Sequence, residues 1–403
     1  MPAGFLVVKA AQAISRELTQ PLTAALTVDA VLGRASTPLP VVPNYNNFTG
    51  SNLSQWLSAQ AAKNAGTRNS VMLPYGDSTV AGVGAGTGAN GVVNGKVGSW
   101  PSILAGLLSG GSATSVFGDN YISSIAGETV YIFDPTVTGT WVANTNGKTL
   151  GYYLNTTVVN TNTLVWAPAT QCDTLVIGWG THATNGVMVV KDESNNTLAT
   201  LNQNAADSMR ENIVTLPGGL GVHTFTVTLS SGSNVNLGYL RVYNSAVKET
   251  TVLTSGCAGL NSTQLISTTL AYSPINSMKF IAPDLTLIEG GVVNDWLQAI
   301  PLATSLSNLQ AQITAAKLSG SAIMVSPPVG QPGIAYATQA QYVAQMKSLA
   351  YSNNIPFIDV WNGVFGGTYQ ASLMFDTKHC NTAGYTAIAN FIVPALAAGF
   401  KAA

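Results

Sequence analysis

Two short stretches, far apart in the sequence, hold residue types that could do chemistry together. The stretch FDTKHC places Asp376 three positions before His379, one of only three histidines in the chain. A carboxylate beside an imidazole fixes the tautomer of the ring and stabilises the imidazolium, so such a pair can act as a general base. The early stretch LPYGDSTVAG offers Ser78, and a serine hydroxyl becomes a useful nucleophile when a base lies within hydrogen-bond distance. The two stretches together predict nucleophilic catalysis by Ser78.

Each of these residues also has a purely structural interpretation. Gly-Asp-Ser before a helix is ordinary capping sequence, so Ser78 could be a helix N-cap. Asp376 and His379 could likewise satisfy backbone N–H groups at the start of the helix that follows. Asn294, in GGVVNDW, could be a helix cap as well. We favour the catalytic interpretation because a nucleophile and a base are both available.

The segments that must position these residues alternate between short strands and helices. Short apolar runs predict buried strands at 70–76, 251–256, 285–291, 321–328 and 356–363. Helical spacing predicts helices at 51–66 (capped by Ser51 or Asn52), 99–110, 294–317, 335–353 and 382–400. Such alternation is typical of a parallel sheet covered on both faces, which binds ligands at the carboxyl ends of its strands. All the candidate residues follow predicted strands or lie in loops on that side.

Residues 128–246 have a different pattern. Thr- and Val-rich runs with partial alternation, separated by Gly, Asn and Ser turns, predict an antiparallel β-sandwich. The predicted organisation is therefore an attachment arm at 1–50, an α/β domain in two parts at 51–127 and 247–403, and the sandwich inserted between them. Core packing is the favoured interpretation of three of its tryptophans, with a sugar-stacking face as the alternative: Trp141, Trp166 and Trp179.

Composition excludes several classes of protein. Charged residues make up 8% of the chain, the net charge is −1 and no long basic run occurs, so a nucleic-acid partner is not expected. Three scattered cysteines argue against a disulfide framework, and no metal or organic cofactor is expected. Cys257 and Cys380 could pair, although buried free thiols are favoured. The first residues make a poor signal peptide, and the apolar C-terminal stretch contains Pro394 and predicts a packed helix rather than a membrane span.

The order of the motifs resembles the SGNH (GDSL-type) hydrolase family over residues 68–130 and 246–400. The resemblance implies that Ser78, within Gly-Asp-Ser, is the nucleophile and also donates its backbone N–H to the oxyanion. It implies that His379 is the base and that Asp376 orients it.

Two further oxyanion donors are implied by the same resemblance. Asn294 would donate its side-chain amide, although two valines separate it from Gly291 where the family usually has one residue. The second donor is a glycine N–H, from either Gly127 or Gly259. We favour Gly259 because it follows the predicted strand at 251–256.

The resemblance also implies a fold and an activity. The fold would be a flavodoxin-like three-layer sandwich with a parallel sheet of about five strands. The activity would be that of a serine esterase that removes a small acyl group, with acetyl expected, from a carbohydrate. The layout looks like phage-tail esterases with a jelly-roll module, which suggests an extracellular or virion-associated protein attached through residues 1–50. The alternatives are a lipase- or thioesterase-type acyl hydrolase and a non-catalytic glycan-binding virion or adhesin component.

Overall fold

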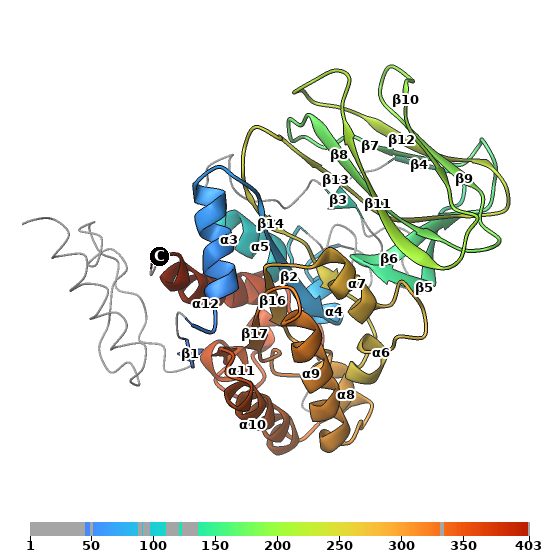
Figure 1. Cartoon of the computed structure of the whole chain (residues 1–403). Helices are drawn as coiled ribbons and strands as arrows, with labels where there is room; N and C mark the ends of the chain where they lie inside the picture. Colours follow the sequence, from blue (N-terminus) through green and yellow to red (C-terminus); the bar gives the residue numbers. More distant parts are fainter. Residues whose placement is uncertain are drawn as a thin grey trace, which may run out of the picture.

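The computed structural model describes residues 45–48, 51–87, 91, 97–109, 121–122, 136–330 and 334–401. An α/β part and a β-rich part lie side by side in it (Figure 1). Gly127 and most of the predicted arm lie outside the described residues. The described part of the arm includes β1, which pairs with the last strand of the central sheet.

A mostly parallel sheet forms the centre of the α/β part. Within the described residues its order is β14–β2–β16–β17–β18–β1, and β15 continues beside β2 beyond β14. Only β1 runs antiparallel to its neighbour in this sheet as described. The strands are β2 (Ser70–Gly76), β14 (Thr250–Val252), β15 (Ser255–Gly256), β16 (Leu285–Ile288), β17 (Ser321–Val325), β18 (Phe357–Ile358) and β1 (Tyr45–Asn46). Taken in chain order, the parallel strands follow the flavodoxin-like order 2-1-3-4-5. The predicted fold class is confirmed.

Helices cover both faces of this sheet (Figure 1). One group consists of α3 (Ser54–Asn64), α5 (Trp100–Ser109) and α12 (Thr382–Lys401). In this group α3 contacts β2 and β17, α5 contacts β14, and α12 packs on α3 and α5. The other group contacts β16, β17 and β18, and consists of α9 (Leu302–Ala316), α10 (Tyr336–Ser352) and, packed on α9, α7 (Pro274–Ile281). Every residue of β16 and β17 is buried, as expected for strands covered on both sides.

The inserted part consists of two antiparallel sheets in the described residues. One has the order β10–β9–β12–β7–β4, and the other has the order β11–β8–β13–β6–β5 with β3 beside β13. The strands are β3 (Tyr121–Ile122), β4 (Thr136–Thr138), β5 (Val142–Thr149), β6 (Gly151–Thr156), β7 (Thr163–Trp166), β8 (Thr174–Thr181), β9 (Val187–Lys191), β10 (Thr197–Asn202), β11 (Ser208–Thr215), β12 (Phe225–Ser231) and β13 (Val235–Tyr243). Since β3 pairs with β13, this sheet includes residues ahead of the predicted start at 128. The jelly-roll arrangement stays a prediction.

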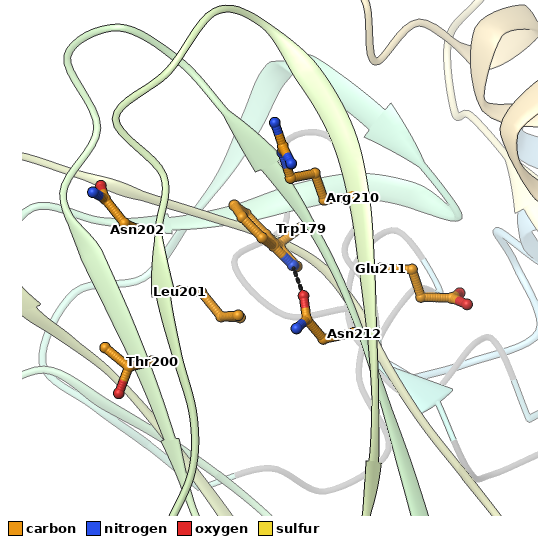
Figure 2. Close-up of a pocket in the computed structure, with 7 residues that line it drawn as sticks. All are labelled: Trp179, Thr200, Leu201, Asn202, Arg210, Glu211 and Asn212. Carbon is orange, nitrogen blue, oxygen red and sulfur yellow. Dashed lines mark hydrogen bonds between the residues drawn. The ribbon is translucent and has the colours of Figure 1, made fainter.

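The tryptophans of the sandwich do not form one exposed face. Trp141 and Trp166 are 0% and 1% exposed and belong to the sandwich core. The favoured interpretation, core packing, is therefore confirmed for these two, and the alternative of a sugar-stacking face is wrong for them. Trp179 is 7% exposed and lines a hollow between β10 and β11 (Figure 2).

The sandwich packs against α7 of the α/β part. Tyr153 of β6 and Tyr272, just before α7, place their ring centroids 5.5 Å apart. Ser277 of α7 donates its hydroxyl to the sulfur of Met209 on β11, at 3.2 Å. The insertion is thus held by direct side-chain contacts as well as by its two connections.

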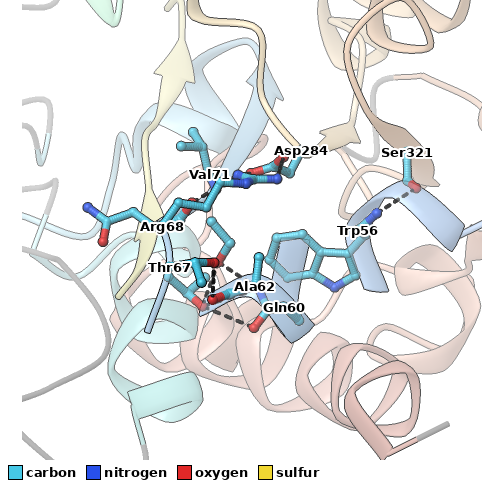
Figure 3. Close-up of polar contacts among 11 residues, drawn as sticks. Trp56, Gln60, Ala62, Thr67, Arg68, Val71, Asp284 and Ser321 are labelled. Carbon is cyan, nitrogen blue, oxygen red and sulfur yellow. Dashed lines mark hydrogen bonds and ion pairs between the residues drawn. The ribbon is translucent and has the colours of Figure 1, made fainter. Parts of the chain in front are cut away.

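Polar contacts anchor α3 to three strands of the central sheet (Figure 3). The backbone N–H of Trp56, whose side chain is fully buried, donates to Ser321 Oγ of β17 at 3.2 Å. The amide of Gln60 donates to Ser70 Oγ of β2 at 2.7 Å and to Thr250 Oγ1 of β14 at 3.2 Å. Buried polar groups need such partners, and these bonds fix the position of α3 along the sheet.

The start of α3 differs from the prediction. The N-cap is Leu53, which makes no side-chain capping bond. Asn52, one of the two predicted caps along with Ser51, instead donates its amide to Asn47 O at 2.6 Å. The Asn52 side chain therefore binds the segment before the turn and does not cap α3.

The predicted helix at 294–317 is two helices, α8 (Val292–Leu297) and α9. Pro301 is the residue before α9, and Ala299 has a φ of 53°. Proline has no N–H to donate and disfavours helical conformation in the residue before it, so a continuous helix cannot form here. The break turns α9 onto the face of the sheet.

The strand predicted at 356–363 is also shorter than expected. It ends at β18, and Asp359 then caps a short helix, α11 (Val360–Gly363), by accepting from Asn362 N at 3.0 Å. An aspartate that can cap a turn competes with continuation of a strand.

No helix in the described part of the chain combines the length and apolarity needed to cross a bilayer.

Candidate active site

Ser78 lies at a sharp corner between β2 and a single turn of helix, α4 (Ser78–Ala81). Asp77, not Ser78, is the N-cap, and its Oδ1 accepts from Thr79 N at 2.9 Å and from Thr79 Oγ1 at 3.1 Å. Gly82, with a φ of 83°, ends the turn. The capping interpretation is therefore wrong for Ser78, whose hydroxyl is available for other contacts.

The hydroxyl of Ser78 meets the ring of His379. Ser78 Oγ lies 2.9 Å from His379 Nε2, although 301 positions separate the residues in sequence. His379 Nδ1 lies 2.7 Å from Asp376 Oδ2. The three side chains thus form a continuous hydrogen-bonded row at the carboxyl end of β2. The structure brings together the three residues that the sequence singled out as nucleophile, base and orienting acid.

Asp376 is held as a carboxylate. Its burial alone would raise its pKa, but hydrogen bonding to His379, the charge of that ring and two backbone N–H groups lower the pKa to about 2. The two N–H groups belong to Lys378 and His379 and donate to Oδ1 at 2.8 and 2.7 Å. Because an ionised carboxylate only accepts, it selects the tautomer with a proton on Nδ1. The Nε2 atom is then free to accept the proton of Ser78.

The loop that carries His379 is fixed against residues that follow α4. A Cβ on Gly84 would come within 2.5 Å of Cys380 O and 3.1 Å of His379 Cβ, and Gly84 has a φ of 95°. The fully buried Tyr385 donates its hydroxyl to Val83 O at 2.8 Å. Only glycine combines this φ with so close an approach. Neither residue was singled out from the sequence, where an isolated Gly or Tyr gives no sign of a distant partner.

The two predicted oxyanion loops lie beside Ser78. Asn294 Nδ2 donates to Asp77 Oδ2 at 3.1 Å and to Leu260 O at 3.0 Å. Its amide therefore connects the residue before Ser78 with the residue after Gly259. Gly259 is exposed with a φ of 80°, and a Cβ there would meet nothing within 4 Å. The residue therefore has free space on its Cβ side, close to the loop that contacts Asn294.

Asn294 is not a helix cap. It is the third residue of α8, whose N-cap is Gly291 with a φ of 79°. The left-handed conformation at Gly291 accommodates the longer spacing produced by the two valines. Both amide hydrogens of Asn294 have acceptors in this state of the protein, so donation to an oxyanion would share or replace one of these bonds.

Glu289, directly after β16, is a site residue that the sequence interpretation missed. It is 2% exposed, and its Oε2 accepts from Asp77 N at 3.4 Å and from Gly291 N at 3.2 Å. A Cβ on Gly76 would lie 2.3 Å from this oxygen. Oε1 has no hydrogen-bond partner among the described residues. Glu289 thus connects the backbone before Ser78 with the loop that leads to Asn294.

The environment of Glu289 favours its neutral form. Burial, together with the charge of Asp77, raises the pKa of Glu289 well above its ordinary value, and burial also raises the pKa of Asp77. A buried carboxylate without full hydrogen bonding is costly, so the proton is retained. The only sequence signal for this role was a glutamate directly after an apolar strand.

Replacement of Glu289 by glutamine should flatten the pH dependence of stability. The unfolded carboxyl ionises near its ordinary pKa of 4.5, whereas the folded one keeps its proton to higher pH. This group's contribution to stability is therefore complete below that pH and is lost as the pH rises toward the folded pKa. An amide cannot ionise and escapes that loss. Thermal unfolding of both proteins in buffers from weakly acid to weakly alkaline pH would show it, and parallel Tm curves would contradict it.

The described residues contain no group of three or more His, Cys, Asp or Glu side chains placed to hold a metal ion. The three cysteines, Cys172, Cys257 and Cys380, are buried and form no disulfide. The alternative of a bridge between Cys257 and Cys380 is therefore wrong. The geometry at Ser78 is that of a side-chain nucleophile with its own base.

Comparison with known proteins agrees with this geometry. Residues 219–387 match the family model described as GDSL-like lipase/acylhydrolase. The matched range contains Asn294, Asp376 and His379, while Ser78 lies ahead of it, before the inserted sandwich. A comparison with curated protein sequences gave no match.

One solved structure shares the fold over most of its length, and two others are similar at a lower TM-score. A peptidoglycan O-acetylesterase is similar over 87% of this chain and 97% of its own, with 13% identity and a TM-score of 0.63. A family two carbohydrate esterase from Cellvibrio japonicus covers 70% of this chain and 98% of its own, with 12% identity and a TM-score of 0.28. A catalytic mutant of an acetylxylan esterase from Geobacillus stearothermophilus covers 36% and 73%, with 20% identity and a TM-score of 0.31. Residues 219–387 thus resemble the GDSL-like lipase/acylhydrolase family, and the chain is a carboxylic ester hydrolase.

Proposed function

We propose that this hydrolase is a serine esterase that removes an acetyl group from a carbohydrate, with Ser78, His379 and Asp376 as its catalytic residues. The observation that carries the proposal is the hydrogen-bonded row from Ser78 Oγ to His379 Nε2 and from His379 Nδ1 to Asp376 Oδ2, at 2.9 and 2.7 Å. These distances allow proton transfer without rearrangement of the side chains.

Acylation begins when Ser78 Oγ attacks the ester carbonyl carbon. His379 Nε2 takes the hydroxyl proton as the C–O bond forms, and the Asp376 carboxylate stabilises the resulting imidazolium. The tetrahedral intermediate then collapses, and the bond to the sugar oxygen breaks. His379 gives its proton to that oxygen, so the sugar leaves as an alcohol and Ser78 carries the acetyl group.

The oxyanion of the intermediate would accept hydrogen bonds from three donors. These are the backbone N–H of Ser78, at the first turn of α4, the backbone N–H of the exposed Gly259 and the amide of Asn294. Each donor aimed at developing charge is typically worth about 3 kcal/mol of barrier. Asn294 would shift one amide hydrogen from Asp77 or Leu260 to the oxyanion, a move favoured by the full negative charge.

Deacylation repeats these steps with water as the nucleophile. His379 Nε2 accepts a proton from the water, the hydroxide attacks the acetyl carbon, and the bond to Ser78 Oγ breaks. The proton returns to Oγ, and acetic acid leaves and ionises to acetate in solution.

The acetyl-carbohydrate assignment is supported by the solved structure that shares the fold over most of both chains, a peptidoglycan O-acetylesterase. An extracellular or virion-associated location stays a prediction. So does attachment to a larger assembly through residues 1–50, most of which lie outside the described residues.

An acyl-chain series separates this proposal from a lipase or thioesterase. With nitrophenyl esters of increasing length, kcat/KM should be highest for acetate and fall with each added methylene, because a site for a small acyl group has no room for a tail. The enzyme should also release acetate from at least one acetylated polysaccharide in a panel. Activity that rises with chain length, and no acetate from any polysaccharide, would overturn the acetyl-carbohydrate assignment.

A further inference from the structure

A hollow of about 450 Å³ opens at one edge of the sandwich (Figure 2). It lies between β10, the edge strand of one sheet, and β11, the edge strand of the other. Its volume falls in the range of small-ligand sites. The lining residues are Trp179, Thr200, Leu201, Asn202, Arg210, Glu211 and Asn212.

Trp179 and Arg210 form a stacked pair at this hollow. They are direct register partners on β8 and β11, and the guanidinium carbon lies 5.8 Å from the centroid of the indole. Stacking on an indole holds the plane of a guanidinium and leaves its N–H edges free. Among the described residues, Arg210 has no ion-pair partner. The hollow therefore contains an exposed, oriented and unpaired positive charge.

The two asparagines present donors to the same space. Trp179 Nε1 can only donate, and it donates to Asn212 Oδ1 at 2.8 Å, which leaves the NH₂ group of Asn212 unused. Asn204 N donates to Asn202 Oδ1 at 3.1 Å, so the NH₂ group of Asn202 is also left over. Neither NH₂ group has a recorded acceptor within the described residues. The orientation of both amides is fixed by groups that cannot accept.

Glu211 is the one carboxylate among the lining residues, and it does not neutralise the charge of Arg210. Glu211 alternates with Arg210 and Asn212 along β11, and its Oε2 accepts from the hydroxyl of the buried Tyr239. Successive side chains of a strand point to opposite faces. Figure 2 accordingly shows the carboxylate of Glu211 directed away from Trp179 and Arg210. The ligand of the hollow must supply acceptors and a negative charge.

We propose that the hollow between β10 and β11 binds a carboxylate-bearing saccharide, such as a uronic acid unit of an acidic polysaccharide, through Arg210, Asn202 and Asn212. The guanidinium pairs with the carboxylate, the two amides donate to carboxylate or hydroxyl oxygens, and Thr200 contacts a hydroxyl at the rim. The saccharide part of the assignment rests on the proposed function, while the negative charge rests on the hollow alone. The site would hold the polymer while its ester groups reach Ser78.

Calorimetric titration of the full chain with trigalacturonate tests the proposal, with the methyl-esterified trimer as the uncharged match. The free acid should bind, and the ester should bind at least roughly tenfold more weakly because it lacks the charge. Arg210→Gln should weaken binding of the free acid by a similar factor, and Asn202→Asp should do so by repulsion. Lys191→Gln removes the same charge from another strand of the sandwich and should leave binding unchanged.

Several results would overturn the site. These are no binding by the wild type, equal binding of acid and ester, unaltered binding by Arg210→Gln, or an equal loss in Lys191→Gln. Hydrolysis of nitrophenyl acetate should be the same in all four proteins, since none of the substitutions lies near Ser78. A wild type that binds trigalacturonate but hydrolyses no ester would defeat the proposed function and leave the site standing. The melting temperature of each variant checks that the exposed substitutions leave the fold intact.

Discussion

The Ser78→Ala variant should be almost inactive, with kcat on nitrophenyl acetate lower than wild type by roughly five to six orders of magnitude. The methyl group leaves no atom to form the acyl-enzyme, and His379 then has no proton to accept. Binding and oxyanion stabilisation remain, so a small residual rate above that of water is expected. Folding should be nearly unaffected, because Ser78 Oγ contributes one hydrogen bond, to His379, at 2.9 Å. Initial rates with a sensitive chromogenic ester, together with a thermal melt, measure both effects.

A matched control guards against a general loss of stability. Ser267→Ala removes a hydroxyl that contacts only Thr269 in a loop beyond α6 (Ser262–Leu265), and it should retain full activity. If Ser78→Ala hydrolysed the ester as fast as wild type, Ser78 would not be the nucleophile. The non-catalytic glycan-binding alternative would then gain support if wild type were also no faster than buffer.

Local sequence patterns predicted the parts of the site that depend on neighbouring residues. The strand 70–76 has the predicted bounds because a short apolar run ends at Gly76 before a polar corner. Asp376 and His379 were predicted as a pair because a separation of three positions in a turn already brings their side chains together. Their meeting with Ser78 could be predicted only through the fold, since parallel strands present their carboxyl ends at one edge.

Other features depend on contacts that no local pattern contains. Gly84 allows the His379 loop to approach, but its need for glycine arises from the backbone of Cys380. The pKa of Glu289 is raised because the fold buries it beside Asp77, which a sequence pattern does not reveal. In each case the partner lies far away in the sequence, so residue type alone left the role open.

The domain arrangement, too, was predicted where a sequence pattern was strong and missed where no pattern existed. Alternation in residues 128–246 indicated strands, yet it could not show that Tyr121–Ile122 would join β13. Two-residue strands bury too little to leave a pattern, and β1 was missed for the same reason. A long apolar run such as 285–291 was easier to assign, although only its first four residues form β16.

Replacement of Asp376 by asparagine should lower kcat by about four orders of magnitude while leaving the fold nearly intact. The asparagine oxygen can still accept from the N–H groups of Lys378 and His379, which hold the loop at 2.8 and 2.7 Å. Its NH₂ group, however, would donate to His379 Nδ1 and place the ring proton on Nε2. That nitrogen would then point a proton at Ser78 and could not act as a base.

The comparison that isolates this effect uses Asp359→Asn as its control. Asp359 also accepts backbone and side-chain N–H groups in a turn, at 3.0 and 2.7 Å, but caps α11 and contacts no imidazole. It should keep nearly full activity with a similar small change in Tm, whereas Asp376→Asn should lose activity out of proportion to any loss of stability. Because the wild-type carboxylate has a pKa of about 2, it remains ionised throughout any practical assay range. A kcat for Asp376→Asn within tenfold of wild type would mean that Asp376 only caps its loop and that something else orients His379.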